Sequence, residues 1–323
     1  MATALATLMS KAAVPLVGGH ASPIARLERL EAALGPDAPR IFVKRDDLLP
    51  FAQGGNKVRK LQMLAADATR MGATALITCG AVQSNHARVT AAAGAVLGLP
   101  VILVLNGERP DPPVGNYLRD LLFGAEVRIV ARRDDRDSQM EAAADEIRRA
   151  GGTPYVIPMG GSTPIGAMGM ARAIAELSAD RLRPDVIVCA SSSGGTQAGL
   201  MAGCTLFGVP SRVAGISADL DAADLTSVVG DLLDRTAMAL GSSPGSLTGV
   251  HGIDADDSQV GPGYGVPTDA SEEATRLLAR REGILLDNVY TSKAMAGLIA
   301  RVRAGDFSPG QTVLFWLTGG LVG

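Results

Sequence analysis

The sequence predicts an α/β fold of two doubly wound, mostly parallel sheets. Short apolar runs alternate with helical patterns along almost the whole chain, as in sheets that carry helices on both faces. Most of the runs are apolar at every position, which is expected where both faces of a parallel strand are covered. The length of 323 residues favours about two domains, because a domain averages roughly 150 residues.

The elements follow one another in a regular order. The expected strands are 41–45, 74–79, 101–105, 126–130, 155–157, 185–190, 212–217 and 312–317. The expected helices are 57–70, 85–97, 116–123, 137–149, 164–178, 195–207, 221–240, 269–281 and 292–303. Glycines that suit a helix C-terminus follow several of them, at Gly72, Gly98, Gly124, Gly151 and Gly208. The segment 241–263 is rich in Gly, Ser and Asp, and it is expected to be a long loop.

The alternation also suggests a division of the chain. The continuous series of strands and helices between 74 and 150 predicts one small sheet, and the other strands predict a larger one. We therefore expect a small α/β domain over 51–162. A large α/β domain over 1–50 and 163–323 would carry most of the functional site.

Composition narrows the class of partner. The chain has 30 Lys and Arg against 33 Asp and Glu, a net charge of −3, which argues against a nucleic-acid or anionic-membrane surface.

Three cysteines without CxxC spacing fit neither a zinc site nor a disulfide framework. Cys79 and Cys189 are expected to be buried in a reducing compartment. Lys11 interrupts the start of any signal peptide, and no uncharged stretch is a continuous spanning helix. These features predict a cytoplasmic protein with no metal and no membrane contact.

A lysine-containing loop precedes the helix expected at 57–70. Gln53-Gly54-Gly55-Asn56-Lys57 places a lysine at the helix start, where the exposed backbone amides favour an anion. A lysine there can pair with a phosphate or act as a nucleophilic amine. An ordinary loop with a surface lysine is the alternative.

A Ser/Gly loop follows the strand expected at 185–190. Residues 191–199 read SSSGGTQAG, and a strand, a loop of small residues and a helix in this order can cradle a phosphate with backbone amides. The loop has neither the GK[ST] of a Walker A motif nor the GxGxxG of a dinucleotide-binding turn. A tight turn that needs only small residues is the alternative.

Other polar and aromatic residues lie at strand ends or helix starts, where open α/β sheets bind ligands. Ser84-Asn85-His86 opens a helix and can hold a carboxylate, although a simple N-cap serine explains it equally well. Tyr264 in GPGYG and Tyr290 in VYTSK can be site residues or packed core tyrosines. Together, a phosphate cup, a candidate nucleophilic lysine and ring-sized groups suit pyridoxal phosphate, which needs a Schiff-base lysine.

The motifs resemble the fold-type-II pyridoxal-phosphate enzymes of the 1-aminocyclopropane-1-carboxylate deaminase and D-cysteine desulfhydrase family. The resemblance runs in order from about Pro23 to Gly320. It is carried by KRDDL at 44–48, GGNKVRKL at 54–61, QSNHAR at 83–88, SSSGGTQAGL at 191–200, GPGYG at 261–265, ILLDNVYTSKAM at 284–295 and LTGG at 317–320. It implies a tryptophan synthase β-like fold, pyridoxal 5′-phosphate as cofactor, and a homodimer.

The resemblance also implies the cofactor site. Lys57 would hold the cofactor as a Schiff base, Asn85 would bind its phenolic oxygen, and Thr318 would face its pyridine nitrogen. A neutral hydroxyl at that nitrogen makes a weaker electron sink than a carboxylate, which suits elimination. Tyr290 would pack against the ring. The implied cofactor-binding residues are Lys57, Asn56, Asn85, Ser192, Ser193, Gly194, Gly195, Thr196, Tyr290 and Thr318.

The reaction implied is β-elimination from a small amino acid. The implied catalytic residues are Lys57, Ser84, Tyr264 and Tyr290, and the implied substrate-binding residues are Ser84, Asn85, His86 and Thr291. The deaminases resemble QSNQTR and VYEGK at these motifs, so His86 and Thr291 favour the desulfhydrase branch. Lys57 would remove the α-proton, the β-substituent would leave, and D-cysteine would give pyruvate, ammonia and sulfide.

Two departures from the related desulfhydrases border the expected site. Ser292 replaces the glycine of VYTGK, and Leu317 replaces the histidine of HTGG. The sequence therefore keeps other activities open, namely an L-cysteate sulfo-lyase, a 1-aminocyclopropane-1-carboxylate deaminase, an amino-acid racemase or a β-replacement enzyme. A non-catalytic amino-acid-binding relative is the alternative outside the enzymes.

Overall fold

The computed structural model describes residues 1–16, 18, 20–180 and 182–320. Its strands are β1 (Ile24–Arg26), β2 (Arg40–Arg45), β3 (Ala75–Ala81), β4 (Val101–Asn106), β5 (Glu126–Val130), β6 (Pro154–Ile157), β7 (Val186–Ser191), β8 (Arg212–Ser217), β9 (Asp254–Asp256) and β10 (Thr312–Leu317). Its helices are α1 (Ala2–Ser10), α2 (Glu28–Leu34), α3 (Asn56–Arg70), α4 (Asn85–Leu97), α5 (Gly115–Leu122), α6 (Asp135–Arg149), α7 (Pro164–Ala179), α8 (Gly195–Phe207), α9 (Ala222–Ala239), α10 (Asp269–Glu282) and α11 (Thr291–Arg303). Short 3₁₀ turns are Asp46–Leu48 and Met159–Gly161.

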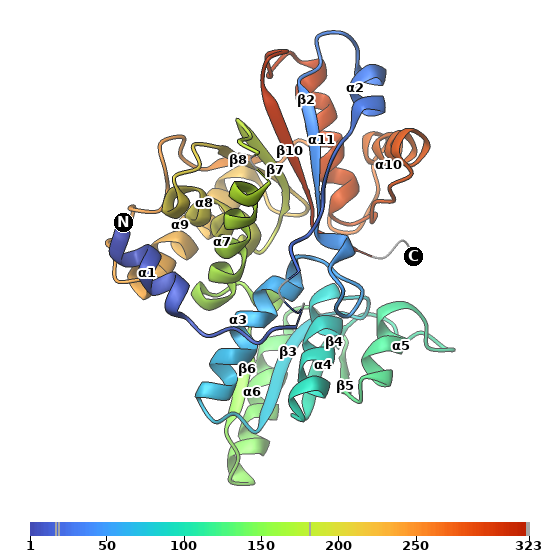
Figure 1. Ribbon diagram of the computed structural model, residues 1–323. Coiled ribbons are helices and arrows are strands. Elements are labelled where there is room, and N and C mark those ends of the chain that lie inside the picture. Colours follow the sequence, from blue (N-terminus) through green and yellow to red (C-terminus); the bar gives the residue numbers. More distant parts are fainter. Residues whose placement is uncertain (17, 19, 181, 321–323) are drawn as a thin grey trace.

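The described strands form two sheets, which lie one above the other in Figure 1. The larger sheet has the order β1-β2-β10-β7-β8-β9, and the smaller has the order β5-β4-β3-β6. The paired strands are parallel except β1, which runs antiparallel to β2. The expected α/β class with two mostly parallel sheets is confirmed.

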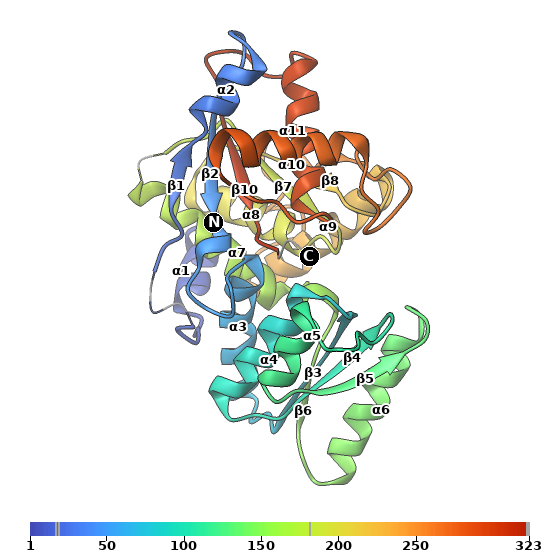
Figure 2. The ribbon, with the colours of Figure 1, turned by 90° about the vertical axis from the view of Figure 1, so that its right-hand side faces the viewer.

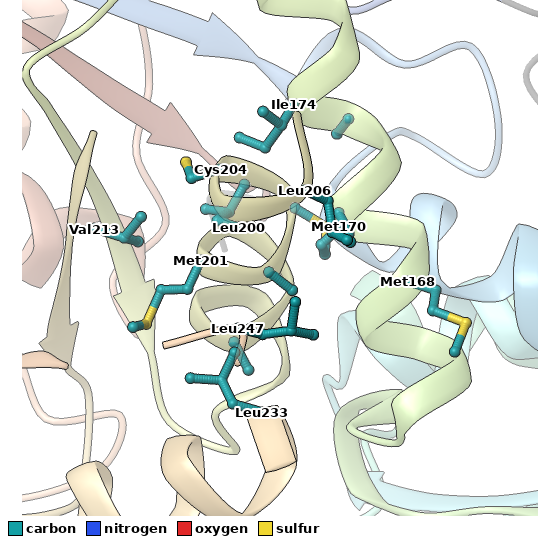
Figure 3. Packing of buried hydrophobic residues seen from close by; sticks show 14 of the residues in the cluster. Met168, Met170, Ile174, Leu200, Met201, Cys204, Leu206, Val213, Leu233 and Leu247 are labelled. Carbon is teal, nitrogen blue, oxygen red and sulfur yellow. The ribbon is translucent and has the colours of Figure 1, made fainter. Parts of the chain in front are cut away.

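The larger sheet is buried on both faces, because its side chains alternate between two apolar layers. On β7, Val186 and Val188 belong to the apolar cluster that contains residues of α10 and α11, whereas Ile187 belongs to the cluster of α7, α8 and α9. Figure 1 shows these two groups of helices on opposite sides of the sheet. Figure 3 shows the α7–α8 layer, in which Met170 lies between the helices. This two-sided burial explains why the strand sequences are apolar at every position.

The smaller sheet is covered in the same way. Its β3 residue Leu76 packs in the cluster of α4 and α5, and the next residue, Ile77, packs against α6. Figure 2 shows α4 and α6 on opposite faces of this sheet. The four strands of the small sheet lie between residues 75 and 157, inside the range 51–162 expected for the small domain. The domain limits themselves stay a prediction.

Four short elements were not predicted from the sequence, namely α1, α2, β1 and β9, and β9 corrects the expectation of a loop throughout 241–263. Tertiary contacts explain two of them. The guanidinium of Arg301 pairs with Asp254 at 2.8 Å and with Asp256 at 2.9 Å, so β9 is held by charge and not by apolar alternation. Arg172 donates to the carbonyl of Leu8 at 2.7 Å, at the end of α1.

Among the described residues, no helix combines the length and apolar character needed to cross a bilayer. The three cysteines are buried and form no disulfide, as expected for Cys79 and Cys189.

Candidate functional site

A cavity lies where the carboxyl ends of the two sheets face each other. Residues at the ends of, or just after, strands from both sheets form its wall, among them Ala81, Asn106, Met159, Ser191, Asp219 and Thr318. Ligands of open α/β sheets bind at this edge. The sequence-predicted residues on the wall are Asn56, Lys57, Ser84, Asn85, His86, Ser192, Ser193, Gly194, Gly195, Thr196, Tyr264, Tyr290 and Thr318.

The turn before α3 brings Lys57 to the cavity. Gly55 has a φ of 100°, and a Cβ on it would lie 2.9 Å from the carbonyl oxygen of Thr318, so only glycine allows this approach. The next residue, Asn56, donates its backbone N–H to the same Thr318 oxygen at 2.9 Å. The start of α3 is thereby fixed to the end of β10, although the two segments lie far apart in the sequence.

Two lysine amines meet at one carbonyl group. Lys57 Nζ lies 3.4 Å and Lys60 Nζ lies 3.1 Å from the carbonyl oxygen of Gly160. Burial lowers the pKa of Lys57 to about 8, against a smaller opposing effect of its hydrogen bond with Lys60. Burial, and then the charge of Lys57, lower the pKa of Lys60 well below its usual value. Lys57 therefore supplies an amine that is partly unprotonated near neutral pH.

The N-terminus of α8 forms the predicted cup. Gly194 caps the helix with a φ of 74°, and Asn56 Nδ2 donates to Thr196 Oγ1 at 2.7 Å. The hydroxyls of Ser162 and Ser193 lie 2.8 Å apart. A Cβ on Gly195 would lie 2.5 Å from Ser162 Oγ and 2.7 Å from Lys60 Nζ. Free helix amides and a neighbouring lysine amine suit an anion in this cup.

The start of α4 presents Ser84 and Asn85 to the cavity. Ser84 caps the helix, because its Oγ accepts the backbone N–H of Ala87 at 3.2 Å. Asn85 Oδ1 accepts hydrogen bonds from Arg88 Nη1 and from Asn116 Nδ2, both at 3.0 Å. Arginine has only donors, which assigns the oxygen end of Asn85 to this contact. The Nδ2 group of Asn85 is therefore the end that can donate to a ligand.

His86 is buried and neutral. Its Nε2 lies 2.9 Å from Thr78 Oγ1, whose own hydrogen goes to the carbonyl oxygen of Ile157 at 2.7 Å. His86 Nε2 must then carry a hydrogen, which leaves Nδ1 as a buried acceptor with no hydrogen-bond partner among the described residues. Burial, and then Lys57 and Lys60, lower the pKa of His86 well below 6.5. Its ring thus has no spare N–H for the substrate carboxylate that the resemblance assigns to it.

Two tyrosines form the wall on the side of the larger sheet. The hydroxyls of Tyr264 and Tyr290 lie 2.5 Å apart, and the rings meet edge to face with centroids 5.8 Å apart. Burial raises the pKa of both phenols, and that of Tyr290 is well above its usual value. One hydroxyl donates to the other, so the pair keeps one hydrogen for a further acceptor.

Thr291 lies away from the cavity wall, in contrast to the expected substrate contact. Its Oγ1 donates to Asp287 Oδ2 at 2.5 Å, and its backbone N–H donates to the same oxygen at 3.0 Å. The residue is buried. Its position at the start of α11 explains this, because the aspartate satisfies amides that a helix N-terminus leaves free.

Several cavity residues were missed by the sequence analysis. Among them are Asn106, Arg133, Arg136, Met159, Gly160, Ser191 and Asp219. None lies in one of the quoted candidate motifs except Ser191, which begins the Ser/Gly loop. Most of them follow the strands of the two sheets, so the rule that ligands bind beyond the carboxyl ends of parallel strands was the available signal.

Comparison with known proteins identifies the family. The family model described as "Pyridoxal-phosphate dependent enzyme" matches residues 17–319. The chain belongs to the pyridoxal-phosphate-dependent enzymes. It is 41% identical over 315 residues to a D-cysteine desulfhydrase of Salmonella choleraesuis (strain SC-B67), covering 94% of this chain and 92% of that protein.

Solved structures of related enzymes agree with the fold. An ACC deaminase homologue superposes with a TM-score of 0.90 at 37% identity, over 100% of this chain and 96% of that one. The processed form of threonine deaminase isoform 2 from Solanum lycopersicum superposes with a TM-score of 0.71 at 15% identity, over 99% of this chain and 84% of that one. The second likeness shows the shared fold alone.

The cavity fits pyridoxal phosphate, the cofactor of this family. A phosphate needs donors without competing side-chain bulk, and Gly195 leaves that space beside the Lys60 amine. The buried Ser191 hydroxyl on the same wall has no hydrogen-bond partner among the described residues. Lys57 offers a partly unprotonated amine in the same cavity. We therefore assign the cup, Asn56, Asn85, Tyr290, Thr318 and Lys57 as the proposed cofactor site.

Proposed function

We propose that this protein catalyses β-elimination from a small β-substituted amino acid, with D-cysteine as the first candidate substrate and pyruvate, ammonia and sulfide as products. The Lys57 amine carries the proposal, because it faces one cavity together with the N-termini of α4 and α8. The 41% identity to a D-cysteine desulfhydrase over 94% of the chain supports the choice of substrate.

The chain's own groups can perform the proton transfers of this reaction. Pyridoxal phosphate, when bound, supplies an electron-withdrawing ring that stabilises negative charge at the substrate α-carbon. Lys57 Nζ would accept the α-proton, and a pKa of about 8 leaves roughly a tenth of the amine unprotonated at pH 7. The neutral His86 ring lies beside this amine without competing for its proton.

Two polar walls would orient the substrate. Ser84 accepts a backbone N–H with its oxygen, so its hydroxyl hydrogen is free for the α-carboxylate at the positive end of α4. On the opposite side, the Tyr264–Tyr290 pair keeps one hydroxyl hydrogen for a leaving group. These roles stay proposals for Ser84, Tyr264 and Tyr290.

A product assay tests the proposed function. The loaded enzyme is incubated with D- and L-cysteine, L-cysteate, β-chloroalanine and 1-aminocyclopropane-1-carboxylate, and the products are measured. Pyruvate with sulfide from D-cysteine supports the proposal, and the K57A variant should abolish it. Pyruvate with sulfite, 2-oxobutyrate, or the mirror-image amino acid would each assign a different activity. A protein that releases no product from any of these compounds would contradict β-elimination.

We also propose a homodimer located in the cytoplasm. On α5, Leu118, Leu121 and Leu122 are exposed, and their i, i+3, i+4 spacing gives one apolar face that a second copy can cover. The buried, unpaired cysteines suit a reducing compartment. Light scattering should give the mass of two chains, and L122E should shift it towards one chain. A wild-type mass of one chain would contradict the dimer.

A further inference from the structure

Arg136 is a buried arginine on the cavity wall. It lies in the first turn of α6 with 8% of its surface exposed. Its Nε donates to the backbone oxygen of Arg133 at 2.8 Å. Its Nη1 lies 3.4 Å from Asn106 Oδ1 and 3.6 Å from Met159 Sδ. These contacts hold the guanidinium over the carboxyl ends of β4 and β6.

The charge of Arg136 is not balanced by an ion pair. Within the described ranges, no carboxylate lies within ion-pair distance of its guanidinium, and Nη2 has no acceptor. The nearby acids are used elsewhere or face solvent. Asp219 lies 3.7 Å from Arg133, Asp135 accepts the backbone N–H of Arg132 at 3.2 Å, and Asp137 is exposed. A buried cation without a counter-charge is costly, so an anion in the cavity would stabilise it.

Arg136 and Ser84 reach the cavity from opposite faces of the smaller sheet. Helices α4 and α6 cover opposite faces of the smaller sheet (Figure 2). Ser84 caps the N-terminus of α4, Arg136 lies in the first turn of α6, and both line the cavity. An amino acid whose α-carboxylate lies at Ser84 can therefore direct its side chain towards Arg136.

We propose that Arg136 binds a negatively charged group on the β-carbon of the substrate. Amino acids whose β-substituent is anionic, such as a sulfonate, a sulfate ester or a carboxylate, should then bind more tightly than uncharged amino acids of similar size. This inference rests on the proposed function, since it concerns the side chain of the same amino-acid substrate. Arg133 contributes less, because its side chain is half exposed and already lies near Asp219.

Calorimetry on the loaded enzyme tests the proposal without turnover of a leaving group. Aspartate and asparagine differ mainly in the charge of the β-substituent, and alanine reports binding of the common amino-acid part. Each is titrated as the D and the L enantiomer. We expect aspartate to bind at least about tenfold more tightly than asparagine, the size of one charge-assisted hydrogen bond.

Two variants test whether the Arg136 side chain causes the preference for aspartate over asparagine. R136Q should bring the aspartate-to-asparagine affinity ratio close to one, and R136K should retain part of it. R132Q is the matched control, because Arg132 lies on the same segment with an exposed side chain, and it should leave the ratio unchanged. If R136Q does not fold, the aspartate-to-asparagine affinity ratio of the wild-type protein still tests the proposal.

The outcomes separate this inference from the proposed function. Equal affinity for aspartate and asparagine in the wild type, with alanine bound, would overturn the Arg136 proposal and leave β-elimination standing. A wild-type preference that R136Q retains would also overturn it. Failure to bind any of these amino acids would overturn the Arg136 proposal, whereas the product assay alone decides β-elimination.

Discussion

Arg88 Nη1 donates a hydrogen bond to Asn85 Oδ1 at 3.0 Å, and this contact determines which end of the Asn85 amide faces the cavity. Arg88 is buried, and its Nη2 also reaches the carbonyl oxygen of Gly54 at 3.3 Å. One side chain therefore links the start of α4 with the turn before α3, the two segments that present Asn85 and Lys57.

The first prediction concerns Arg88 as a positioning residue. In R88Q the Asn85 amide loses a charge-assisted hydrogen bond and keeps only the one from Asn116, so its Nδ2 is aimed less firmly at the cofactor. We expect kcat/KM to fall by about tenfold or more, together with a shifted absorption maximum of the bound cofactor. R70Q, at an exposed site, is the control. An unchanged spectrum with lowered melting temperature would assign Arg88 a purely structural role.

The second prediction concerns Asp120, a buried carboxyl on α5. Neither of its oxygens has a hydrogen-bond partner among the described residues, and burial raises its pKa to about 8 against the opposing charge of Arg88. The folded protein therefore binds one more proton than the unfolded chain between about pH 4 and pH 8, and stability falls as the pH rises through this window.

Thermal unfolding of D120N tests whether the stability of the protein falls as the pH rises. At pH 5 the folded carboxyl is still neutral, so the stability advantage of the variant over the wild type should be smaller than at higher pH. At pH 8.5 D120N should be more stable by at least about 1 kcal/mol. D37N at an exposed turn is the control. Parallel pH profiles for D120N and the wild type would refute the buried, protonated carboxyl.

The third prediction concerns the cup. A methyl group at Gly195 would lie 2.5 Å from Ser162 Oγ and 2.7 Å from Lys60 Nζ, where the phosphate is proposed to bind. G195A should therefore weaken cofactor binding by about tenfold or more, measured by equilibrium titration of the cofactor-free protein. G310A is the control, because no atom lies within 4 Å of a Cβ there. Equal affinity in G195A and wild type would place the phosphate elsewhere.

The fourth prediction concerns the Lys57 amine in the cofactor-free protein. Burial lowers its pKa to about 8, so its reaction with a small acylating reagent should reach half its maximal rate near pH 8. Peptide mapping separates Lys57 from Lys60 and from Lys11, which lies outside the cavity. A midpoint near the ordinary lysine value of about 10.4 would show that the cavity does not desolvate the amine.

Most of the sheet structure was predictable because burial acts on each strand separately. The segment 185–190 is apolar at almost every position, and the structure explains this by the two layers that receive Val186 and Ile187. Elements that are held by ion pairs with distant residues show no such apolar pattern in the sequence. Strand β9 carries Asp254 and Asp256. Their ion-pair partner Arg301 lies in helix α11, far away in the sequence.

The site was predictable only where it lies in compact motifs. Lys57 and the Ser/Gly loop stand at helix starts that local sequence reveals. Arg136 lies on α6 beside the smaller sheet, and Asp219 follows β8 of the larger sheet. Both line the same cavity, and only the tertiary fold brings them together. The side-chain state of His86 was equally hidden, because it depends on the hydrogen bond of Thr78 to Ile157.

The central claim is that Lys57 carries the cofactor. The most direct measurement is borohydride reduction of the loaded protein, followed by peptide mapping by mass spectrometry. The chain has few lysines, at positions 11, 44, 57, 60 and 293, so the modified residue is assigned without ambiguity. The account predicts the cofactor mass on Lys57 and its loss in K57A. Modification of Lys60, or of no lysine, would contradict it.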